Sequence, residues 1–269
     1  MLKYHSKWGD CMTYTVVVRD QDRSQTVLDE ITRKIKLDRD DKSPDIVIAI
    51  GGDGTILKAF HLYPKSLLFG IKTGTLGFYS NYLGDDLDKM IDDINNQTYS
   101  VSELDLLKIA FIDKDGMKKE DFALNEITVV SPLRTLRLDV YVDNLYLERF
   151  RGTGVCVSTP SGSTAYNKSL HGAVIDSDLS VMQLTEIAGI NSNAYRTLSS
   201  PLILSNERTI MLKAVDFDKT FITVDNKQYS LDNLNAVKIS INEDKFRMAY
   251  HDYESFYKRL QRTFLISLK

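Results

Sequence analysis

Cysteine, proline and glycine are scarce in this 269-residue chain, and their scarcity excludes several classes of protein. The two cysteines, Cys11 and Cys156, are too few for a disulfide framework or a cysteine-based zinc site. We expect both to be buried or incidental thiols in a reducing compartment. With five prolines, 14 glycines and 43% hydrophobic residues, the composition is that of an ordinary globular protein with one large or two moderate domains.

The chain also lacks a surplus of basic residues and long apolar runs. Its 34 lysines and arginines are outnumbered by 37 aspartates and glutamates, which gives a net charge of −3. Nucleic-acid-binding proteins more often carry a basic surplus, so an anionic ligand must be bound locally, by backbone amides, a few cations or a metal ion. No run approaches the ~20 apolar residues that span a membrane, and residues 1–10 lack the apolar core of a signal peptide. We therefore expect a cytoplasmic protein with no nucleic-acid or membrane partner.

Two common catalytic patterns are missing as well. Ser161 stands in Pro-Ser-Gly rather than Gly-x-Ser-x-Gly, so the nucleophile elbow of a hydrolase is not supported. The histidines are scattered without metal-ligand spacing, at His5, His61, His171 and His251. The chemistry must therefore be sought in other motifs.

The first hundred residues alternate between apolar strands and amphipathic helices. Strands are predicted at 13–19, 45–50 and 67–71, and helices at 22–36, 55–62 and 85–95. The run 45–50 is apolar without alternation, as is typical of a parallel strand that is covered on both faces. This order predicts a doubly wound α/β domain over roughly residues 12–100.

After Tyr99 the sequence becomes a series of short strand candidates. They lie at 105–112, 122–130, 136–142, 145–150, 154–158, 202–204, 209–214, 221–224 and 236–241. Turn signals such as Asp115-Gly116 and Asp143-Asn144 separate several of them. A helix is predicted around 181–187, and residues 253–265 are predicted to form an amphipathic helix that docks back onto the first domain. The expected division is 1–100 (α/β), 101–249 (mainly β) and a C-terminal segment, 250–269.

The first motif that indicates chemistry is Gly-Gly-Asp-Gly-Thr at 51–55, directly after a buried strand and at the start of a helix. Glycines let a backbone approach phosphate oxygens, and the helix N-terminus supplies free N–H groups. An anionic Asp53 would repel phosphate, but it suits a group that accepts a proton from an attacking hydroxyl or holds Mg²⁺. The alternative is a plain strand-to-helix turn in which Asp53 caps the helix.

Two more motifs lie in the second half. Asn125-Glu126 places an amide beside a carboxylate, which can bind sugar hydroxyls or an adenine edge, although polar residues on a strand usually face solvent. The run from Ser158 to Asn167 carries five hydroxyl side chains before Tyr166 and no charge. Small residues give close backbone access and Tyr166 offers a stacking face, so the run indicates a pocket wall rather than a solvated loop.

Together these motifs resemble the NAD kinase family, particularly its bacterial members. The resemblance extends from about Asp45 to Leu202, and includes Thr-Gly-Thr-Leu-Gly-Phe at 73–78 and Glu-Arg-Phe-Arg-Gly at 148–152. Diacylglycerol and sphingosine kinases share the glycine motif alone. The Asn-Glu pair and the hydroxyl-rich run are more specific to NAD kinases.

The resemblance implies an N-terminal α/β domain, a mainly β C-terminal domain and a nucleotide site between them. It implies transfer of the γ-phosphoryl of ATP to the 2′-hydroxyl of the adenosine ribose of NAD, with Mg²⁺ held mainly by the phosphates. Asp53 would be the general base, with Gly52 and Gly54 against phosphates. The other residues that it implies in binding are Thr55, Phe78, Asn125, Glu126, Arg151, Thr153, Thr164, Ala165, Tyr166, Asn167, Ser169 and Ala188. In relatives the positions of Arg151 and Ala188 line the site partly across a subunit interface, so a homodimer or homotetramer is expected.

The sequence departs from the family pattern at a few positions. Thr153 stands where the family usually has an aspartate that contacts the dinucleotide, and Ser199 replaces a common glycine. Lys72 and Thr75 replace histidines that are common in close relatives. Because Asp53 and the Asn-Glu pair are present, we expect an altered affinity for the dinucleotide, or an altered pose of it, rather than lost activity. A lipid kinase of the diacylglycerol type and a non-catalytic NAD-binding regulator, the latter supported only by Thr153, are the alternatives.

Overall fold

The chain forms two compact units, residues 1–104 with 246–269 and residues 105–245. The computed structural model describes residues 12–19, 21–72, 77–116, 118–214, 217, 219–229, 233–251 and 255–265, without the side chains of 21–24, 83 and 84. The expectations for Cys11, for Thr75 and the rest of 73–76, and for positions 253–254 lie outside the described residues.

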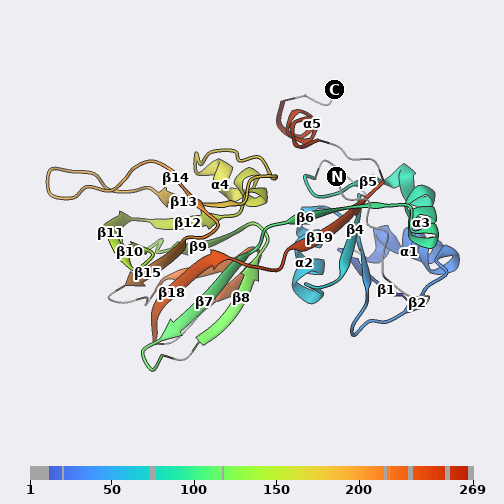
Figure 1. Cartoon of the computed structure of the whole chain (residues 1–269), viewed down its shortest axis with the longest axis horizontal. Coiled ribbons are helices and arrows are strands. Elements are labelled where there is room, and N and C mark those ends of the chain that lie inside the picture. The colour runs from blue at the N-terminus through green and yellow to red at the C-terminus, as the bar shows by residue number, and fades with distance from the viewer. Residues whose placement is uncertain are drawn as a thin grey trace. The chain divides into compact units, whose positions relative to one another are not determined.

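The first unit is built on a largely parallel sheet (Figure 1). Its strands are β1 (Thr13–Val18), β2 (Asp38–Arg39), β3 (Ile46–Ile50), β4 (Leu67–Lys72), β5 (Tyr82–Leu83), β6 (Ser100–Leu104) and β19 (Phe246–Tyr250). The order is β2-β1-β3-β4-β19-β6, with β5 also paired to β4. Every residue of β3 and β4 is buried, which confirms the prediction that the run 45–50 forms a parallel strand covered on both faces.

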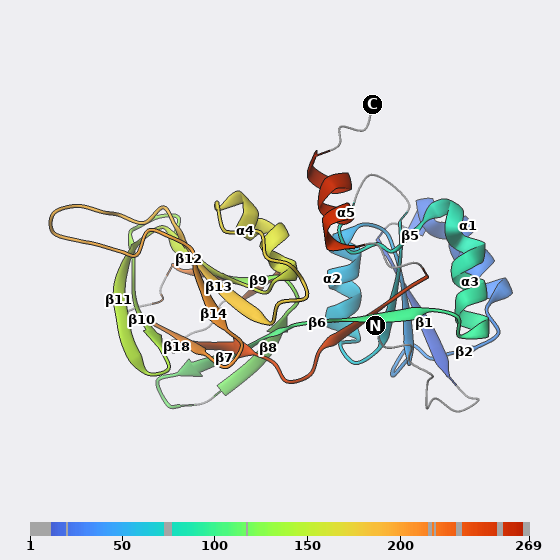
Figure 2. The same cartoon turned by 45° about the horizontal axis from the view of Figure 1, so that its top comes forward.

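Helices cover both faces of this sheet (Figure 2). Helices α1 (Gln21–Lys34) and α3 (Leu87–Asn96) pack on one face, where Ile31 and Met90 join Phe69 in a single apolar cluster. Helix α2 (Asp53–Leu62) covers the other face. A Cβ at Gly70 would lie 2.8 Å from Cδ1 of Ile56, so this glycine lets α2 approach β4 closely. The predicted doubly wound α/β architecture is confirmed.

Two strands of this sheet fall outside the range expected for the α/β domain. Strands β6 and β19 lie within residues 101–249 apart from their ends, yet β19 pairs parallel with β4 and antiparallel with β6. Phe246 and Met248 are buried where β19 enters the sheet. The chain therefore returns to the first sheet after completing the second unit, a long-range pairing that local patterns do not reveal.

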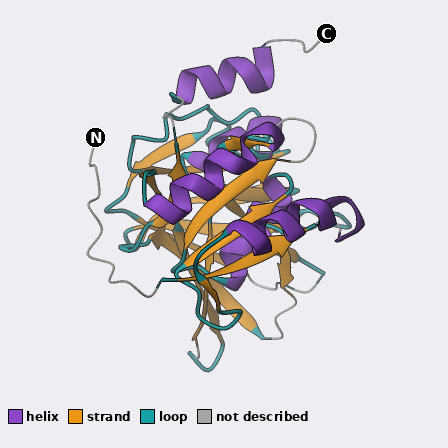
Figure 3. Ribbon diagram, turned by 90° about the vertical axis from the view of Figure 1, so that its right-hand side faces the viewer, coloured by secondary structure: helices purple, strands orange, loops and turns teal. Residues whose placement is uncertain are grey.

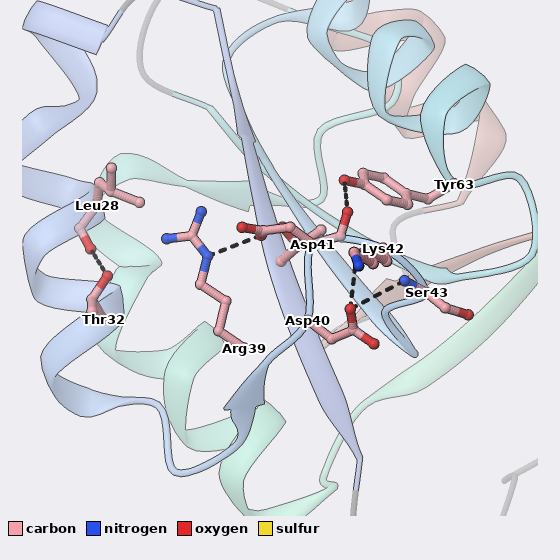
Figure 4. Close-up of polar contacts among 9 residues, drawn as sticks. Leu28, Thr32, Arg39, Asp40, Asp41, Lys42, Ser43 and Tyr63 are labelled. Carbon is pink, nitrogen blue, oxygen red and sulfur yellow. Dashed lines mark hydrogen bonds and ion pairs between the residues drawn. The ribbon is translucent and has the colours of Figure 1, made fainter.

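The loops at the far end of α2 are closed by local hydrogen bonds (Figure 4). Asp40 Oδ1 accepts a 2.8 Å hydrogen bond from the backbone N–H of Lys42, which shapes the turn before β3. The Tyr63 hydroxyl, directly after α2, donates to the carbonyl of Asp41 at 2.9 Å. The second contact joins the segment that follows α2 to the turn that precedes β3.

The C-terminal segment packs on the first unit through an aromatic contact. Helix α5 (Phe256–Leu260) begins after Ser255, whose hydroxyl accepts from the N–H of Lys258, and continues as the π-helical turn η3 (Gln261–Leu265) (Figure 3). The Phe256 ring is buried and lies 6.0 Å from the Phe78 ring in an edge arrangement. The helix predicted over 253–265 is thus present at 256–265.

The described strands of the second unit form two sheets. One has the order β11-β10-β15-β18-β7-β8, and the other β14-β13-β12-β9-β16-β17. The strands are β7 (Leu107–Asp113), β8 (Lys118–Ala123), β9 (Glu126–Val130), β10 (Leu136–Val142), β11 (Leu145–Gly152), β12 (Gly154–Ser158), β13 (Val181–Ile187), β14 (Leu202–Ser205), β15 (Thr209–Ala214), β16 (Phe221–Val224), β17 (Lys227–Tyr229) and β18 (Leu234–Ile241). Asp143 and Asn144 have φ of 50° and 68°, which confirms the predicted turn between β10 and β11.

Among the described residues, no helix has the length and apolarity needed to cross a membrane.

Two predictions for this unit were wrong. Residues 181–187 form strand β13, not a helix, because they pair with β12 and β14 and direct Met182 and Leu184 into the core between the sheets. The strand predicted over 122–130 is two strands, β8 and β9, separated at Leu124-Asn125. The break brings the Asn-Glu pair to a turn instead of the middle of a strand.

A buried carboxylate ties α3 to the sheet of the first unit. Asp93, only 2% exposed, accepts hydrogen bonds from the hydroxyls of Tyr82 at 3.0 Å and Thr98 at 2.8 Å. His251, just after β19, places Nδ1 2.8 Å from Asp93 Oδ2. One side chain thus joins α3, β5 and the end of β19.

We predict that Asp93→Ala lowers the free energy of unfolding of the first unit by about 3 kcal/mol, because it leaves buried donors without an acceptor. Urea unfolding followed by far-UV circular dichroism measures the change. Asp92→Ala, at an exposed position of the same helix, is the matched control and should change little. Equal effects of the two substitutions would show that this network does not stabilise the unit.

Candidate active site

The Gly-Gly-Asp-Gly-Thr motif forms the connection from β3 to α2. The N–H of Gly51 donates to the carbonyl of Ile71 at 3.0 Å, and a Cβ at Gly51 would lie 2.3 Å from Oγ1 of Thr55. Gly51 therefore has to be glycine for the loop to close. A Cβ at Gly52 or Gly54 would meet no heavy atom within 4 Å, so open space adjoins both. The buried Thr55 Oγ1 has no hydrogen-bond partner among the described residues.

Asp53 is the first residue of α2, and its carboxylate is held by two backbone amides. Oδ2 accepts from the N–H of Phe78 at 2.9 Å, and Oδ1 accepts from the N–H of Tyr79 at 3.0 Å. A Cβ at Gly77 would lie 2.7 Å from Oδ1, so the segment wraps closely around the carboxylate. The side chain does not cap α2, whose N-cap is Gly52. Among the described residues each oxygen accepts one hydrogen bond, and its second lone pair can serve as a proton acceptor.

The ring of Phe78 is only 7% exposed. It contacts Phe256 edge-on, and the guanidinium of Arg259 lies 5.7 Å from its centroid. The backbone of Phe78 thus orients Asp53 while its ring anchors the C-terminal segment. Its predicted part in an adenine pocket stays a prediction.

The Asn-Glu pair of the second unit is held by a carboxylate that the sequence motifs did not reveal. Asp225 accepts from the backbone N–H groups of Leu124 at 2.9 Å, Asn125 at 2.8 Å and Glu126 at 3.2 Å. It lies in the turn between β16 and β17 with φ of 51°. An Asp-Asn pair is an ordinary hairpin turn signal, so only its long-range contacts identify this role.

The carboxyl group of Glu126 is unusually hard to ionise. The residue is 8% exposed, and Oε2 has no hydrogen-bond partner among the described residues. Burial, and then the negative charge of Asp225, raise the pKa of Glu126 to about 8, while a hydrogen bond from the backbone N–H of Tyr166 opposes the shift. Such a carboxyl can donate or accept a hydrogen bond near neutral pH, and its pKa marks it as a functional candidate.

The hydroxyl-rich run packs directly against the Asn-Glu turn. It forms the 3-10 turn η2 (Ser161–Thr164) and the short helix α4 (Tyr166–Ser169). Thr159 donates from Oγ1 to the carbonyl of Leu124 at 2.6 Å and from N–H to the carbonyl of Asn125 at 2.9 Å. A Cβ at Gly162 would lie 2.0 Å from the Asn125 carbonyl oxygen, so only glycine fits there. The structure thus brings the second and third motifs together.

Several polar side chains of this run are used for structure. The hydroxyl of Thr164 donates to the carbonyl of Ser161 at 2.9 Å, and Asn167 accepts from Thr185 Oγ1 at 2.7 Å. Asn167 is fully buried, whereas Tyr166 is 45% exposed and Ser169 is also exposed. Ala165, directly before Tyr166, is half-buried. Of the predicted binding residues in this segment, Tyr166 and Ser169 are therefore the ones with exposed side chains.

Arg151, Thr153 and Ala188 form a third group, at the ends of β11, β12 and β13. The guanidinium of Arg151 lies 3.6 Å from the centroid of the Tyr195 ring, a cation–π contact. Thr153 donates from its backbone to Ile187 at 3.0 Å, and Ala188 is exposed with φ of 47°. These contacts place the three residues on neighbouring backbone, and their binding roles stay predictions.

The raised pKa of Glu126 predicts a pH-dependent stability. The unfolded carboxyl ionises near 4.5 and the folded one near 8, so its contribution to stability is present below pH 4.5 and is lost as the pH rises to about 8. Glu126→Gln does not titrate, so its stability relative to the parent should rise over this window, by at most about 1.4 kcal/mol per pH unit. Thermal unfolding at pH 5, 6.5 and 8 measures this, with Glu120→Gln on exposed β8 as control. A constant difference between Glu126→Gln and the parent would contradict the burial argument.

Both halves of the chain match one family. Residues 7–99 match the ATP-NAD kinase N-terminal domain, and residues 124–249 match the ATP-NAD kinase C-terminal domain. NAD kinases of Staphylococcus aureus strains JH9 and Newman are each 39% identical over 265 residues, which cover 95% of this chain and 98% of the relative. Neither a lipid kinase nor a non-catalytic regulator is supported by these matches.

Solved structures share the fold. Yeast NADH kinase complexed with NADH matches with a TM-score of 0.81 at 18% identity, covering 96% of this chain and 89% of that one. An NAD kinase from Archaeoglobus fulgidus in complex with ATP matches with a TM-score of 0.72 at 24% identity, covering 94% and 96%. Given both matched domains and the 39% identity over nearly its whole length, the chain belongs to the NAD kinase family and phosphorylates NAD with ATP as the donor.

Proposed function

We propose that Asp53 is the general base of the NAD kinase reaction. It accepts the proton of the 2′-hydroxyl of the adenosine ribose while that oxygen bonds to the γ-phosphorus of ATP. The bond from the γ-phosphorus to the bridging oxygen breaks, and ADP leaves with the electron pair. One observation supports this proposal most directly. The amides of Phe78 and Tyr79 each donate a hydrogen bond to one Asp53 oxygen, which orients the carboxylate and leaves a lone pair for the hydroxyl.

The Asn125-Glu126 turn is proposed to bind the adenosine part of NAD. Its support is the rigid backbone, held by Asp225 on one side and by Thr159 on the other. The Glu126 carboxyl can pair with a ribose hydroxyl in either protonation state, and the accessible ring of Tyr166 can stack on a planar group. Thr164, Ala165, Asn167 and Ser169 complete the proposed set, mainly by shaping this loop.

The phosphates of ATP are proposed to lie along Gly52 and Gly54. Open space adjoins both glycines, and the N-terminus of α2 supplies free amides and partial positive charge. The described residues hold no cluster of three or more metal-ligating side chains, and both oxygens of the single carboxylate in this loop already accept amides. We therefore treat Mg²⁺ as part of the substrate, entering on the phosphates of ATP.

Asp53→Asn should reduce kcat for NADP⁺ formation by about 10²- to 10⁴-fold, because the amide cannot take the proton. NAD binding and the melting temperature should change much less, since the side chain keeps its size. A coupled assay with NAD, ATP and Mg²⁺ measures the rate, and Asp88→Asn, an exposed aspartate in the first turn of α3, is the control. Turnover near that of the parent in Asp53→Asn would remove the residue from this role.

Thr153→Asp tests the position where this chain departs from the family pattern. A carboxylate that reaches the dinucleotide would lower the KM for NAD by about tenfold and leave kcat nearly unchanged. Steady-state kinetics with NAD varied at saturating ATP measure both constants. An unchanged KM would show that this position does not contact the substrate in this chain.

A homo-oligomeric, cytoplasmic protein is proposed as well. Leu145 is 75% exposed on β11, an edge strand, and Ile190 and Leu198 are 42% and 44% exposed after β13. The N–H of Ile190 donates to the carbonyl of Arg151 at 2.7 Å, so Ile190 adjoins a predicted interface position. Exposed apolar groups of this kind support a homodimer or homotetramer. We propose a cytoplasmic location because the two substrates, ATP and NAD, are supplied there.

A further inference from the structure

Lys72 is a buried lysine beside the phosphoryl-transfer loop. It is the last residue of β4 and only 8% exposed. Its backbone pairs with Leu83 of β5, but its ammonium makes no hydrogen bond or ion pair with a residue in the described part of the chain. Lysines are rarely buried to this extent. The stem of the side chain is enclosed, whereas Nζ is not among the fully buried polar atoms, so an anion can reach the ammonium.

The pleat of β4 shows where this side chain points. Gly70 lies on the face of the sheet that α2 covers, since its Cβ would contact Ile56. Side chains two residues apart lie on the same face, so Lys72 also faces α2. It lies two residues nearer the carboxyl end of the sheet, where the Gly51 N–H bonds to Ile71 and α2 begins. Lys72 therefore faces the first turn of α2, which carries Asp53.

The charged groups that act on Lys72 are Arg262 and Asp53. Burial lowers the pKa of Lys72, the positive charge of Arg262 lowers it further, and Asp53 acts in the opposite direction. The oxygens of the Asp53 carboxylate already accept the amides of Phe78 and Tyr79. The N-terminus of α2 adds partial positive charge. An anion bound here would be stabilised by the Lys72 ammonium and by this helix terminus.

We propose that Lys72 binds the phosphate chain of ATP, with its ammonium on the γ-phosphoryl group that is transferred. The proposal rests on the proposed function, in which these phosphates lie along Gly52 and Gly54. A lysine acts on phosphate as a mobile point charge, and positive charge at the transferred group stabilises the transition state. Lys72 also screens the phosphoryl group from Asp53, whose negative charge would otherwise repel it.

Binding of a non-hydrolysable ATP analogue with Mg²⁺, and of inorganic tripolyphosphate, tests this proposal by calorimetry. Lys72→Met should weaken both by at least about tenfold, the loss expected for one charge-assisted hydrogen bond, and should leave NAD binding unchanged. Lys72→Arg, which keeps the charge, should retain most of the tripolyphosphate affinity. Lys58→Met, an exposed lysine on α2, is the matched control and should bind both as the parent does.

Unchanged tripolyphosphate binding by Lys72→Met would overturn the proposal, even if turnover fell, since Lys72 would then act only on Asp53. Equal loss in Lys72→Arg and Lys72→Met would also overturn it, because charge would not be the property that matters. If Lys72→Met melts too low for calorimetry, Lys72→Arg and Lys72→Gln are compared instead, with the same criterion. Failure of the proposed function is seen separately, as parent-like turnover in Asp53→Asn.

Discussion

The chemistry of the first unit depends on two hydrogen bonds, which the backbone amides of Phe78 and Tyr79 donate to the Asp53 carboxylate. This arrangement requires only Gly51 and Gly52 to separate the end of β3 at Ile50 from the start of α2 at Asp53. It also requires a glycine at position 77, since a Cβ there would lie 2.7 Å from Asp53 Oδ1. The dense packing of α2 on Gly70 and the closure of the loops at its far end fix the direction of this helix. A carboxylate fixed in this way loses little conformational freedom when a hydroxyl approaches it.

The second unit uses the same device for a different purpose. Asp225 also accepts backbone amides, but the loop that it orders carries Asn125 and Glu126. Its negative charge adds to the effect of burial and raises the pKa of Glu126. One carboxylate thus sets both the shape of the turn and the protonation of the side chain on it. Gly162 completes the arrangement, because its missing side chain admits the Asn125 carbonyl.

Local patterns revealed most of the elements but not the long-range contacts. The apolar run of β3 and the Asp143-Asn144 turn have one reasonable interpretation each, and both predictions were confirmed. Residues 181–187 contain Met, Gln, Leu and Glu, which favour a helix locally, but pairing with two neighbouring strands outweighs that preference. The return of β19 to the first sheet is likewise decided by tertiary pairing. The site motifs were recognisable as sequences, whereas Asp225, the amides on Asp53 and the inward turn of Asn167 depend on segments far apart in the chain.

A crystal structure of the protein with NAD, Mg²⁺ and a non-hydrolysable ATP analogue tests the central claim most directly. We predict that the 2′-hydroxyl of the adenosine ribose lies within hydrogen-bond distance of an Asp53 oxygen, while the amides of Phe78 and Tyr79 stay bound to that carboxylate. We also predict that the adenosine contacts the Asn125-Glu126 turn. A 2′-hydroxyl that contacts another group, with Asp53 bound only to its two amides, would contradict the role of Asp53 as general base.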